Sequence, residues 1–519
     1  MRSLAQRPCG RVSTARRGRV AITVRAQASS ANGSKWPLDV VVVGAGIGGL
    51  VTASALLEAG ARVRVYEARS LEQALDGPGG ILVQANGEKV MRLLDSPWPT
   101  PSSSSSSFSA SSLSDAVYAV GGPVMSGGFR SDRGDYLYYA AVDSTGLKDL
   151  RSNGLGISRR SLQNILHAAL PAGTVTFGAP LKAFTAPPAG QAGAVKVEFE
   201  DGTVESCDIL IGSDGVRSKV RAQVLREAAG EAAPEKLRYS GTVCWRGRVP
   251  MSRVGKGAEW LSQQVNGDTW AEYWGAGLRF GFFQVGSEVA RDASAPGGLR
   301  QEGEPQIAWY AFANRPEDWS PEPGADEVAR MAGMFKDFAA PVPQVIAALD
   351  PASVSYGRIY DQLPRPAPWA AGRVTLLGDA AHAMMPTLGQ GGCMAIEDGL
   401  ELANELMAAA GGLEGPQADA VAAAGLEAAL RRYEASRAPR TGRVADQSYQ
   451  VAELAMADKP VSVWLRNTIY RLTPKWAGDK QFEYLYTDYV PAWKEGVRQG
   501  RQFGAGAAAA PAQQKVGAA

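Results

Sequence analysis

The sequence predicts an α/β protein in which a parallel-sheet domain carries an inserted, mainly antiparallel sheet domain and is followed by C-terminal helices. Three observations support this prediction. They are a glycine-rich turn that follows a valine-rich strand near the N-terminus, a central block of alternating aromatic segments, and two later strand–turn–helix segments. The chain has 519 residues, enough for about two to four domains of ordinary size.

Composition excludes several classes of function. Lys and Arg number 54 and Asp and Glu 52, so the net charge is +2, whereas a nucleic-acid-binding protein needs a clear surplus of cations. Nucleic acid is therefore not an expected partner. The four cysteines, Cys9, Cys207, Cys244 and Cys393, form no CxxC pair, and the chain has two histidines. Neither a disulfide scaffold nor a bound metal is expected.

Residues 1–35 are predicted to be a transit peptide. The first 38 residues contain seven arginines and no Asp or Glu, and such an Arg- and Ser-rich leader is typical of organelle import. A merely disordered leader is the alternative, and composition does not choose between chloroplast and mitochondrion. Residues 499–519 are predicted to be a disordered tail, and residues 97–114, with six consecutive serines, a surface insertion.

Residues 39–69 carry the glycine pattern of a dinucleotide-binding unit. Gly44, Gly46 and Gly49 form GxGxxG between a predicted strand and a predicted helix. The first glycine permits a tight turn, the second lets backbone approach a pyrophosphate, and the third lets the helix pack on the strand. A second predicted strand ends at Glu67, whose carboxylate can accept hydrogen bonds from the hydroxyls of an adenosine ribose. The pattern predicts a Rossmann-type site for FAD or NAD, because Glu67 would repel the 2′-phosphate of NADP.

Two later segments have the same strand–turn–helix order. Residues 207–221 run from a strand through a turn at Asp214 into a basic helix. Residues 373–402 run from a strand through Asp379 and a Pro- and Gly-rich loop into a long helix. An acid just past the end of a buried strand lies where α/β sheets bind ligands, so Asp379 is a candidate binding residue.

Together these segments resemble the single-component (group A) FAD-dependent monooxygenases. The motifs GAGIGG, SDG and LLGDAAHAMMPTLGQGGCMAIED occur in that family's order and at about its spacing. The resemblance implies bound FAD, NAD(P)H as co-substrate, and transfer of oxygen from O₂ through a flavin C4a-hydroperoxide. It also implies a discontinuous FAD-binding domain, residues 38–235 and 369–410, around a substrate-binding sheet domain, residues 236–368. The C-terminal helical region is expected at residues 425–498.

The resemblance also implies functions for Asp379 and for residues of the loop that follows it. Asp379 would bind the ribityl or ribose part of FAD, and Pro386, a candidate catalytic residue, would border the flavin ring. Gly389, Gly391 and Gly392 would place backbone N–H groups beside the pyrimidine of the flavin. A helix N-terminus at that point can stabilise negative charge on the reduced ring.

Four further residues are assigned in the same way. Arg159 or Arg160 resembles the arginine that reaches FAD, and Arg159 is preferred. Asp214 belongs to the turn associated with FAD and with NAD(P)H, which would bind transiently because the chain has no second GxGxxG. His382 is the second candidate catalytic residue, either as a general acid or, as the motif favours, as a structural hydrogen-bonding group that holds the loop.

Several segments resemble the plant and algal zeaxanthin epoxidases more specifically, among them YSGTVCWRG, IAWYAFANRPED and RIYDQLP. This implies a lipophilic small-molecule substrate, a carotenoid such as zeaxanthin, and a chloroplast location in the stroma or peripheral to the thylakoid membrane. Two departures are evident. Residues 76–94 match loosely, and the chain ends without the forkhead-associated domain that the plant epoxidases carry at their C-terminus.

Other activities remain open at this point. The chain could be a flavin monooxygenase that hydroxylates an aromatic or quinone-type substrate, which would need a positive anchor that sequence cannot place. It could be a carotenoid cyclase or reductase that incorporates no oxygen. It could also be a flavoprotein that binds FAD without turnover.

One C-terminal segment suggests a contact with lipid. Val461, Trp464, Leu465, Ile469 and Leu472 recur at helical spacing, and basic residues accompany them. A basic, aromatic amphipathic helix can lie in a lipid interface, which predicts peripheral contact with a thylakoid or envelope membrane. The alternative is a helix packed on the FAD-binding domain.

Overall fold

The computed structural model describes residues 38–94, 110, 112–141, 154–229, 237–255, 257–292, 294–295, 298–363, 365–410 and 420–497. The predicted transit peptide and C-terminal tail lie outside the described residues, as does most of the serine-rich insertion. No helix among the described residues is long and apolar enough to span a bilayer.

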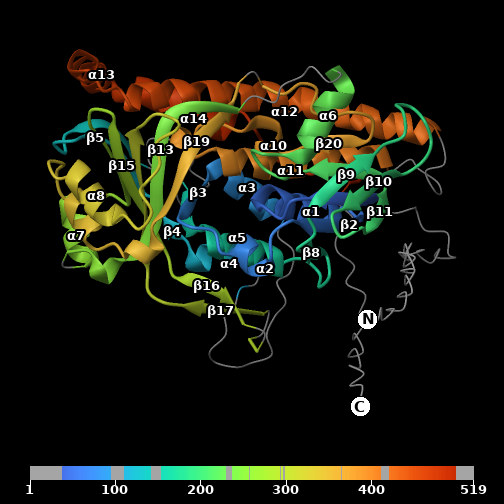
Figure 1. Ribbon diagram of the computed structural model, residues 1–519, viewed down its shortest axis with the longest axis horizontal. Helices are drawn as coiled ribbons and strands as arrows, with labels where there is room; N and C mark the ends of the chain where they lie inside the picture. The colour runs from blue at the N-terminus through green and yellow to red at the C-terminus, as the bar shows by residue number, and fades with distance from the viewer. Residues whose placement is uncertain are drawn as a thin grey trace, which may run out of the picture.

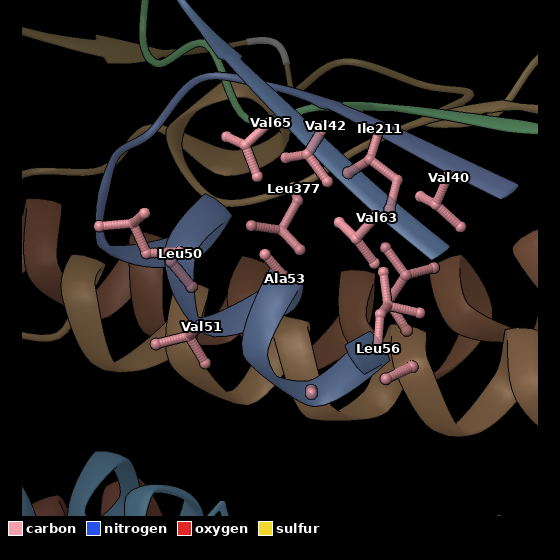
Figure 2. Close-up of a cluster of buried hydrophobic side chains, with 14 of the residues drawn as sticks. Val40, Val42, Leu50, Val51, Ala53, Leu56, Val63, Val65, Ile211 and Leu377 are labelled. Atoms are coloured by element: carbon pink, nitrogen blue, oxygen red, sulfur yellow. The ribbon is translucent and has the colours of Figure 1, made fainter. Parts of the chain in front are cut away.

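A five-stranded parallel sheet in the order β20-β12-β1-β2-β8 forms the first domain. Its strands are β1 (Asp39–Val43), β2 (Arg62–Glu67), β8 (Val175–Phe177), β12 (Ile209–Gly212) and β20 (Val374–Leu376). The helix α1 (Ile47–Glu58) packs against this sheet and against α11 (Gly391–Ala410). Figure 2 shows Val42 and Val63 of the sheet pointing toward Ala53 and Leu56 of α1. Because β12 lies between β1 and β20 and the three strands are parallel, the turns that follow them meet at one edge of the sheet, where α/β proteins bind ligands.

A seven-stranded sheet in the order β19-β13-β18-β15-β14-β5-β6 forms the second domain. Five of its strands come from the aromatic block: β13 (Leu237–Pro250), β14 (Trp270–Trp274), β15 (Leu278–Val285), β18 (Gln306–Asn314) and β19 (Ser355–Gln362). The predicted antiparallel sheet is thus confirmed. One face of this sheet packs against α8 (Glu327–Met334) and α9 (Val342–Ala347) and forms a separate hydrophobic core with them.

The predicted domain boundary is wrong for two strands. We expected all of residues 38–235 in the FAD-binding domain, but β5 (Ser126–Ser131) and β6 (Tyr136–Ala141) belong to the seven-stranded sheet. Strand β5 pairs in parallel with β14, a segment far along the chain. Local sequence does not encode such a pairing, because the neighbour of a strand in a sheet is chosen by tertiary packing.

Smaller sheets complete the fold. A three-stranded sheet, β3 (Gly80–Gln84), β7 (Gly154–Ser158) and β4 (Gly122–Pro123), lies between the two large ones. A second contains β9 (Leu181–Thr185), β10 (Val195–Phe199) and β11 (Val204–Cys207), and a two-stranded sheet pairs β16 (Glu288–Arg291) with β17 (Leu299–Glu302). The remaining helices of these domains are α2 (Leu71–Leu75), α3 (Ala85–Leu93), α4 (Leu113–Val120), α5 (Arg159–Ala168), α6 (Lys219–Ala229), α7 (Ala258–Gln264) and α10 (Asp379–His382).

The predicted C-terminal helices are α12 (Ala420–Ala455), α13 (Pro460–Leu472) and α14 (Lys475–Thr487). The helix α12 packs along α11, and α14 contacts both α3 and β6. In Figure 1, α12 extends across the parallel-sheet domain and α13 projects at one end of the molecule, near β5. The C-terminal region therefore joins the two domains, and the predicted fold class is confirmed.

Candidate active site

The glycine turn after β1 has the geometry that the fingerprint predicts. Gly44 has a φ of +108°, and a Cβ on it would lie 2.3 Å from the carbonyl oxygen of Ser213. A Cβ on Gly49 would lie 2.0 Å from the carbonyl oxygen of Gly44. A Cβ on Gly46, in contrast, would meet no atom of the described chain within 4 Å. Packing of the protein requires Gly44 and Gly49, whereas the open space beside Gly46 fits the approach of a pyrophosphate.

Glu67 lies beside this turn, at the end of β2. Its Oε2 accepts a hydrogen bond of 2.9 Å from the Ala45 N–H, and its Oε1 accepts one of 2.9 Å from Arg69 Nε. Burial opposes ionisation of Glu67, but the hydrogen bonds from Arg69 and Ala45 outweigh it and lower the pKa. The structure thus holds a carboxylate beside the turn, and its contact with a ribose stays a prediction.

A continuous cavity of about 1160 Å³ runs from the glycine turn to the seven-stranded sheet. Seven of the predicted site residues line it: Gly46, Arg159, Asp379, Pro386, Gly389, Gly391 and Gly392. They come from the turn after β1, the start of α5, the start of α10, the loop before α11 and the start of α11. The tertiary structure therefore brings together residues that are far apart in sequence, along one wall.

Two charged side chains in this wall face the cavity without a hydrogen bond to the described chain. Asp379 lies just past the edge of the parallel sheet, as the first residue of α10, and Arg159 is the first residue of α5. Burial and the neighbouring Arg246 lower the pKa of Arg159, while Asp379 opposes this effect. Both side chains are accessible from the cavity, and the hydroxyl and phosphate groups of FAD have the chemistry to pair with them.

The choice between Arg159 and Arg160 can be tested directly. The Arg160 Nε lies 3.6 Å from Asp76 Oδ1, and its Nη1 lies 3.5 Å from Glu302 Oε1, outside the cavity wall. We expect Arg159→Met to weaken FAD binding about ten- to hundredfold, the value of one charge-assisted hydrogen bond. The matched control Arg160→Met should leave the dissociation constant within about twofold. Quenching of flavin fluorescence measures both, and equal losses would contradict the assignment.

Asp214 lies at the predicted turn, but its carboxylate points to the chain itself. The Oδ2 atom accepts hydrogen bonds from the Lys219 and Val220 N–H groups at 2.8 and 3.1 Å, and Oδ1 accepts one from the Ser218 hydroxyl. Asp214 thus caps the start of α6, while its neighbours Ser213 and Gly215 line the cavity. Binding of NAD(P)H near this turn stays a prediction.

The structure does not support His382 as a general acid. His382 is 2% exposed and is absent from the cavity wall. Its Nε2 lies 2.6 Å from Asp398 Oδ2, and the same oxygen accepts a hydrogen bond from the Gly378 N–H. The His382 side chain therefore ties α10 to α11, and the Gly378 N–H ties the turn before α10 to the same carboxylate, which is the structural role that the motif favoured.

A buried hydrogen-bond network behind the loop before α11 was missed in the sequence. Gln84 Nε2 donates to the Leu388 carbonyl at 2.7 Å, and Gln390 Nε2 donates to Gln84 Oε1 at 2.7 Å. Asn86 Nδ2 donates to Gln390 Oε1 at 2.9 Å and to Glu397 Oε1 at 2.6 Å. These amides link the predicted flavin loop to α11.

Two arginines of α12 complete this network. Arg437 donates from Nη1 to Glu397 Oε2 and from Nε to Asp398 Oδ1, each at 2.7 Å. Arg440 donates to both Glu397 oxygens at 2.8 Å, and to the carbonyls of Tyr484 and Leu485 in α14. The adjacent acids inside the apolar run MAIEDGLEL were the one signal in the sequence of such buried charges. The C-terminal helices thus hold the loop from behind.

A second polar cluster lies at the far end of the cavity, within the seven-stranded sheet. Arg279 Nε is 2.6 Å from Glu272 Oε1, and the Tyr310 hydroxyl donates to Glu272 Oε2 at 2.5 Å. Burial and Glu272 raise the pKa of Tyr310 well above its ordinary value, so the hydroxyl stays protonated. Arg246 and Arg358 also line the cavity. These are the positive groups that the sequence could not place.

Aromatic rings from the seven-stranded sheet line the sides of the cavity. They are Phe129, Tyr138, Trp270, Phe283, Trp309 and Phe312. The cavity is thus polar where FAD is predicted, aromatic along its sides, and polar again around Glu272. Among the described residues, no group of His, Cys, Asp and Glu side chains could hold a metal ion.

Comparisons with known proteins agree with this geometry. The model of the FAD binding domain family matches residues 155–448, and that of an NAD(P)-binding Rossmann-like domain matches residues 42–71. Aurachin C monooxygenase/isomerase of Stigmatella aurantiaca is 30% identical over 438 residues, 84% of this chain and 95% of that protein. Chloroplastic zeaxanthin epoxidase of Nicotiana plumbaginifolia is 30% identical over 432 residues, 81% of this chain but 56% of that protein.

A solved structure with bound ligands is also similar. HpxO of Klebsiella pneumoniae, complexed with FAD and uric acid, has 26% sequence identity and a TM-score of 0.67, and the match covers 86% of this chain and 96% of that one. The family model alone spans more than half of the sequence. The chain therefore belongs to the FAD-binding, group A monooxygenase family.

Proposed function

We propose that this protein uses FAD, NAD(P)H and O₂ to oxygenate an aromatic or quinone-type ring. The observation that carries the proposal is the cluster of Glu272, Arg279 and Tyr310, which lies in the same cavity as the predicted FAD-binding residues. A ring with carbonyl or hydroxyl groups can exchange hydrogen bonds with this cluster. The exposed guanidinium of Arg246 lines the same cavity, and a hydrocarbon placed against it would remove water from this charge without supplying a hydrogen bond, which is costly.

Bound FAD would supply the activation of O₂, and the chain would supply position and environment. Arg159 and Asp379 would bind the polar parts of the cofactor. The N-terminus of α11 at Gly391 directs backbone N–H groups and a partial positive charge into the cavity, which favours negative charge on a ring placed there. The aromatic wall would orient the substrate ring and exclude water from the site of oxygen transfer.

Carotenoid epoxidation is the second candidate. It is favoured by the aromatic cavity wall, which suits an apolar chain, and by the similarity to zeaxanthin epoxidase. The chloroplast location belongs with this candidate and, like the transit peptide, stays a prediction from the composition of residues 1–35.

One experiment compares the two candidates. The FAD-loaded protein is incubated with NADH or NADPH and ¹⁸O₂, and with a panel of hydroxyquinolines, quinones, phenols and carotenoids that includes zeaxanthin. We expect an ¹⁸O atom in a ring substrate, together with stimulated oxidation of the reductant. Label in zeaxanthin alone would favour the second candidate. A changed product without label would indicate a cyclase or reductase, and a flavoprotein with no product would be non-catalytic.

Removal of one hydroxyl group tests the polar cluster. We expect Tyr310→Phe to lower kcat/KM for a polar ring substrate roughly tenfold, because a hydrogen bond to a charged cluster is lost. Oxidation of NAD(P)H without substrate and the flavin absorption spectrum should be unchanged. The control is Tyr356→Phe on β19, since the Tyr356 hydroxyl donates to the Trp319 carbonyl and does not line the cavity. Equal effects of the two variants on kcat/KM would reject the role of the cluster. An unchanged kcat/KM in the Tyr310→Phe variant would favour carotenoid epoxidation.

A further inference from the structure

The outward face of α13 is apolar. Val461, Trp464, Leu465, Ile469 and Leu472, which we call the outward stripe, are all exposed, from 49% for Leu465 to 76% for Leu472. Together with Trp476, which is 70% exposed, they make up half of the exposed large hydrophobic side chains in the described chain. A helix of a globular domain normally turns such a stripe toward the core, so this stripe is available to a partner.

The inward face of α13 is held by a charged side chain. Arg466 is 2% exposed, and its guanidinium donates to the carbonyls of Trp274, Gly275 and Ala455 at 3.0 to 3.2 Å. The Tyr470 ring packs edge-on against Trp274, with 5.2 Å between ring centroids. These contacts orient the helix with its apolar stripe outward. The alternative in which the stripe packs on the FAD-binding domain is therefore wrong.

The outward stripe is continuous with the mouth of the cavity. The helix α14 begins three residues after α13 ends, and Trp476, Lys480 and Glu483 of α14 line the cavity. On the other side of the mouth, the Tyr138 hydroxyl donates to Asp479 Oδ1 at 3.1 Å. Because Trp476 is both a cavity-lining and an exposed residue, a molecule leaving the stripe would enter the cavity beside it.

The charge of this segment suits a lipid headgroup layer. Residues 460–478 contain no Asp or Glu, and the exposed Arg471 and Lys475 flank the apolar stripe. Arg471 pairs with Asp135 and Lys475 with Asp479, but both basic side chains remain about half exposed in these pairs. Tryptophan and basic side chains at the edge of an apolar stripe are typical of helices that lie in the interface of a bilayer.

We propose that the outward stripe of α13, together with Trp476, docks on the surface of a lipid bilayer. The cavity mouth beside α14 then faces the membrane and takes up a substrate with an apolar part from it. The uptake of substrate rests on the proposed function, whereas the docking depends only on the surface itself.

Vesicle flotation with the FAD-loaded full chain tests the docking. The probes are vesicles of phosphatidylcholine alone and of phosphatidylcholine with phosphatidylglycerol. We expect the wild type to float with the vesicles, more completely with the anionic ones. The double variant Trp464→Glu with Leu465→Glu should lower the partition coefficient at least about tenfold, because two apolar anchors become charged.

A matched double variant controls for general changes of the surface. Val204→Glu with Val421→Glu changes two exposed valines, 41% and 77% exposed. Val204 lies on β11, far from α13 (Figure 1), and Val421 lies at the start of α12, whose other end adjoins α13. This control should float like the wild type. If the glutamate variant of the stripe fails to bind FAD, Val461→Ser with Ile469→Ser replaces it.

Three outcomes would overturn the docking. The wild type could remain unbound with both kinds of vesicle, or the stripe variants could float as well as the control. Light scattering could instead show a dimer that dissociates in the stripe variant without any vesicle binding, which would make the stripe an interface between copies. Flotation of a protein that oxygenates no substrate would leave the docking intact and remove the proposed function.

Discussion

Arg437→Met is expected to be the most destabilising of the substitutions considered. Arg437 is 1% exposed and lies between the carboxylates of Glu397 and Asp398. Burial would raise the pKa of Asp398, but His382 and Arg437 outweigh this effect and lower it. Loss of one partner of a buried ion pair typically costs about 3–5 kcal/mol, a large part of the roughly 5–15 kcal/mol that stabilises a domain.

Urea unfolding of the apoprotein measures this loss, and an FAD titration should show weaker binding, since the same network holds the loop before α11. Arg432→Met is the control on the same helix. Its Nε lies 2.8 Å from Glu405 Oε2, but the side chain is 52% exposed, so the expected loss is below about 1 kcal/mol. Similar midpoints for the two variants would show that the buried network contributes little.

The second large effect is expected in the glycine turn. Gly49→Ala places a Cβ 2.0 Å from the carbonyl oxygen of Gly44, so α1 has to move away from β1. We expect a loss of stability of about 1–3 kcal/mol, as for overpacking in a core, and no measurable FAD binding. Thermal unfolding of the apoprotein and retained flavin absorbance are the two measurements.

Gly46→Ala separates the packing role of the turn from its binding role. The added Cβ meets no atom of the described chain within 4 Å, and alanine as the N-cap of α1 costs within about 1 kcal/mol. The apoprotein should therefore remain nearly as stable as the wild type, while the affinity for FAD falls at least about tenfold because the Cβ occupies the pyrophosphate space. Unchanged affinity would place the diphosphate elsewhere in the cavity.

Local sequence was sufficient where the structure depends on neighbouring residues. The turn through Gly44 and Gly49, the acid at the end of β2 and the alternating strands of the central aromatic block were all predicted. Each of them is encoded within a few residues by glycine conformation or by alternating burial. The position of Asp379 was predicted for a similar reason, since the end of a buried strand marks the edge of the sheet.

Local sequence was insufficient where distant segments meet. The pairing of β5 with β14 and the network around Arg437 each join elements far apart in the chain, and the cluster around Glu272 brings Tyr310 of β18 to the neighbouring strands β14 and β15. An acid inside an apolar run indicates burial, but the partners of a buried Glu or Arg have no local signature, because packing brings them from other elements. His382 illustrates this, since its distance from the cavity wall became evident only in the structure.

The amino-acid sequence by itself determined the family, the glycine turn and the cofactor class, because a nucleotide-binding turn is a property of consecutive backbone conformations. Only the tertiary structure decided that polar groups face the far end of the cavity and that α13 turns its apolar stripe outward. The sequence shows the same apolar spacing whether the helix turns this stripe inward or outward. The hydrogen bonds of Arg466 to carbonyls of two other segments fix that orientation, and such contacts exist only after the chain has folded.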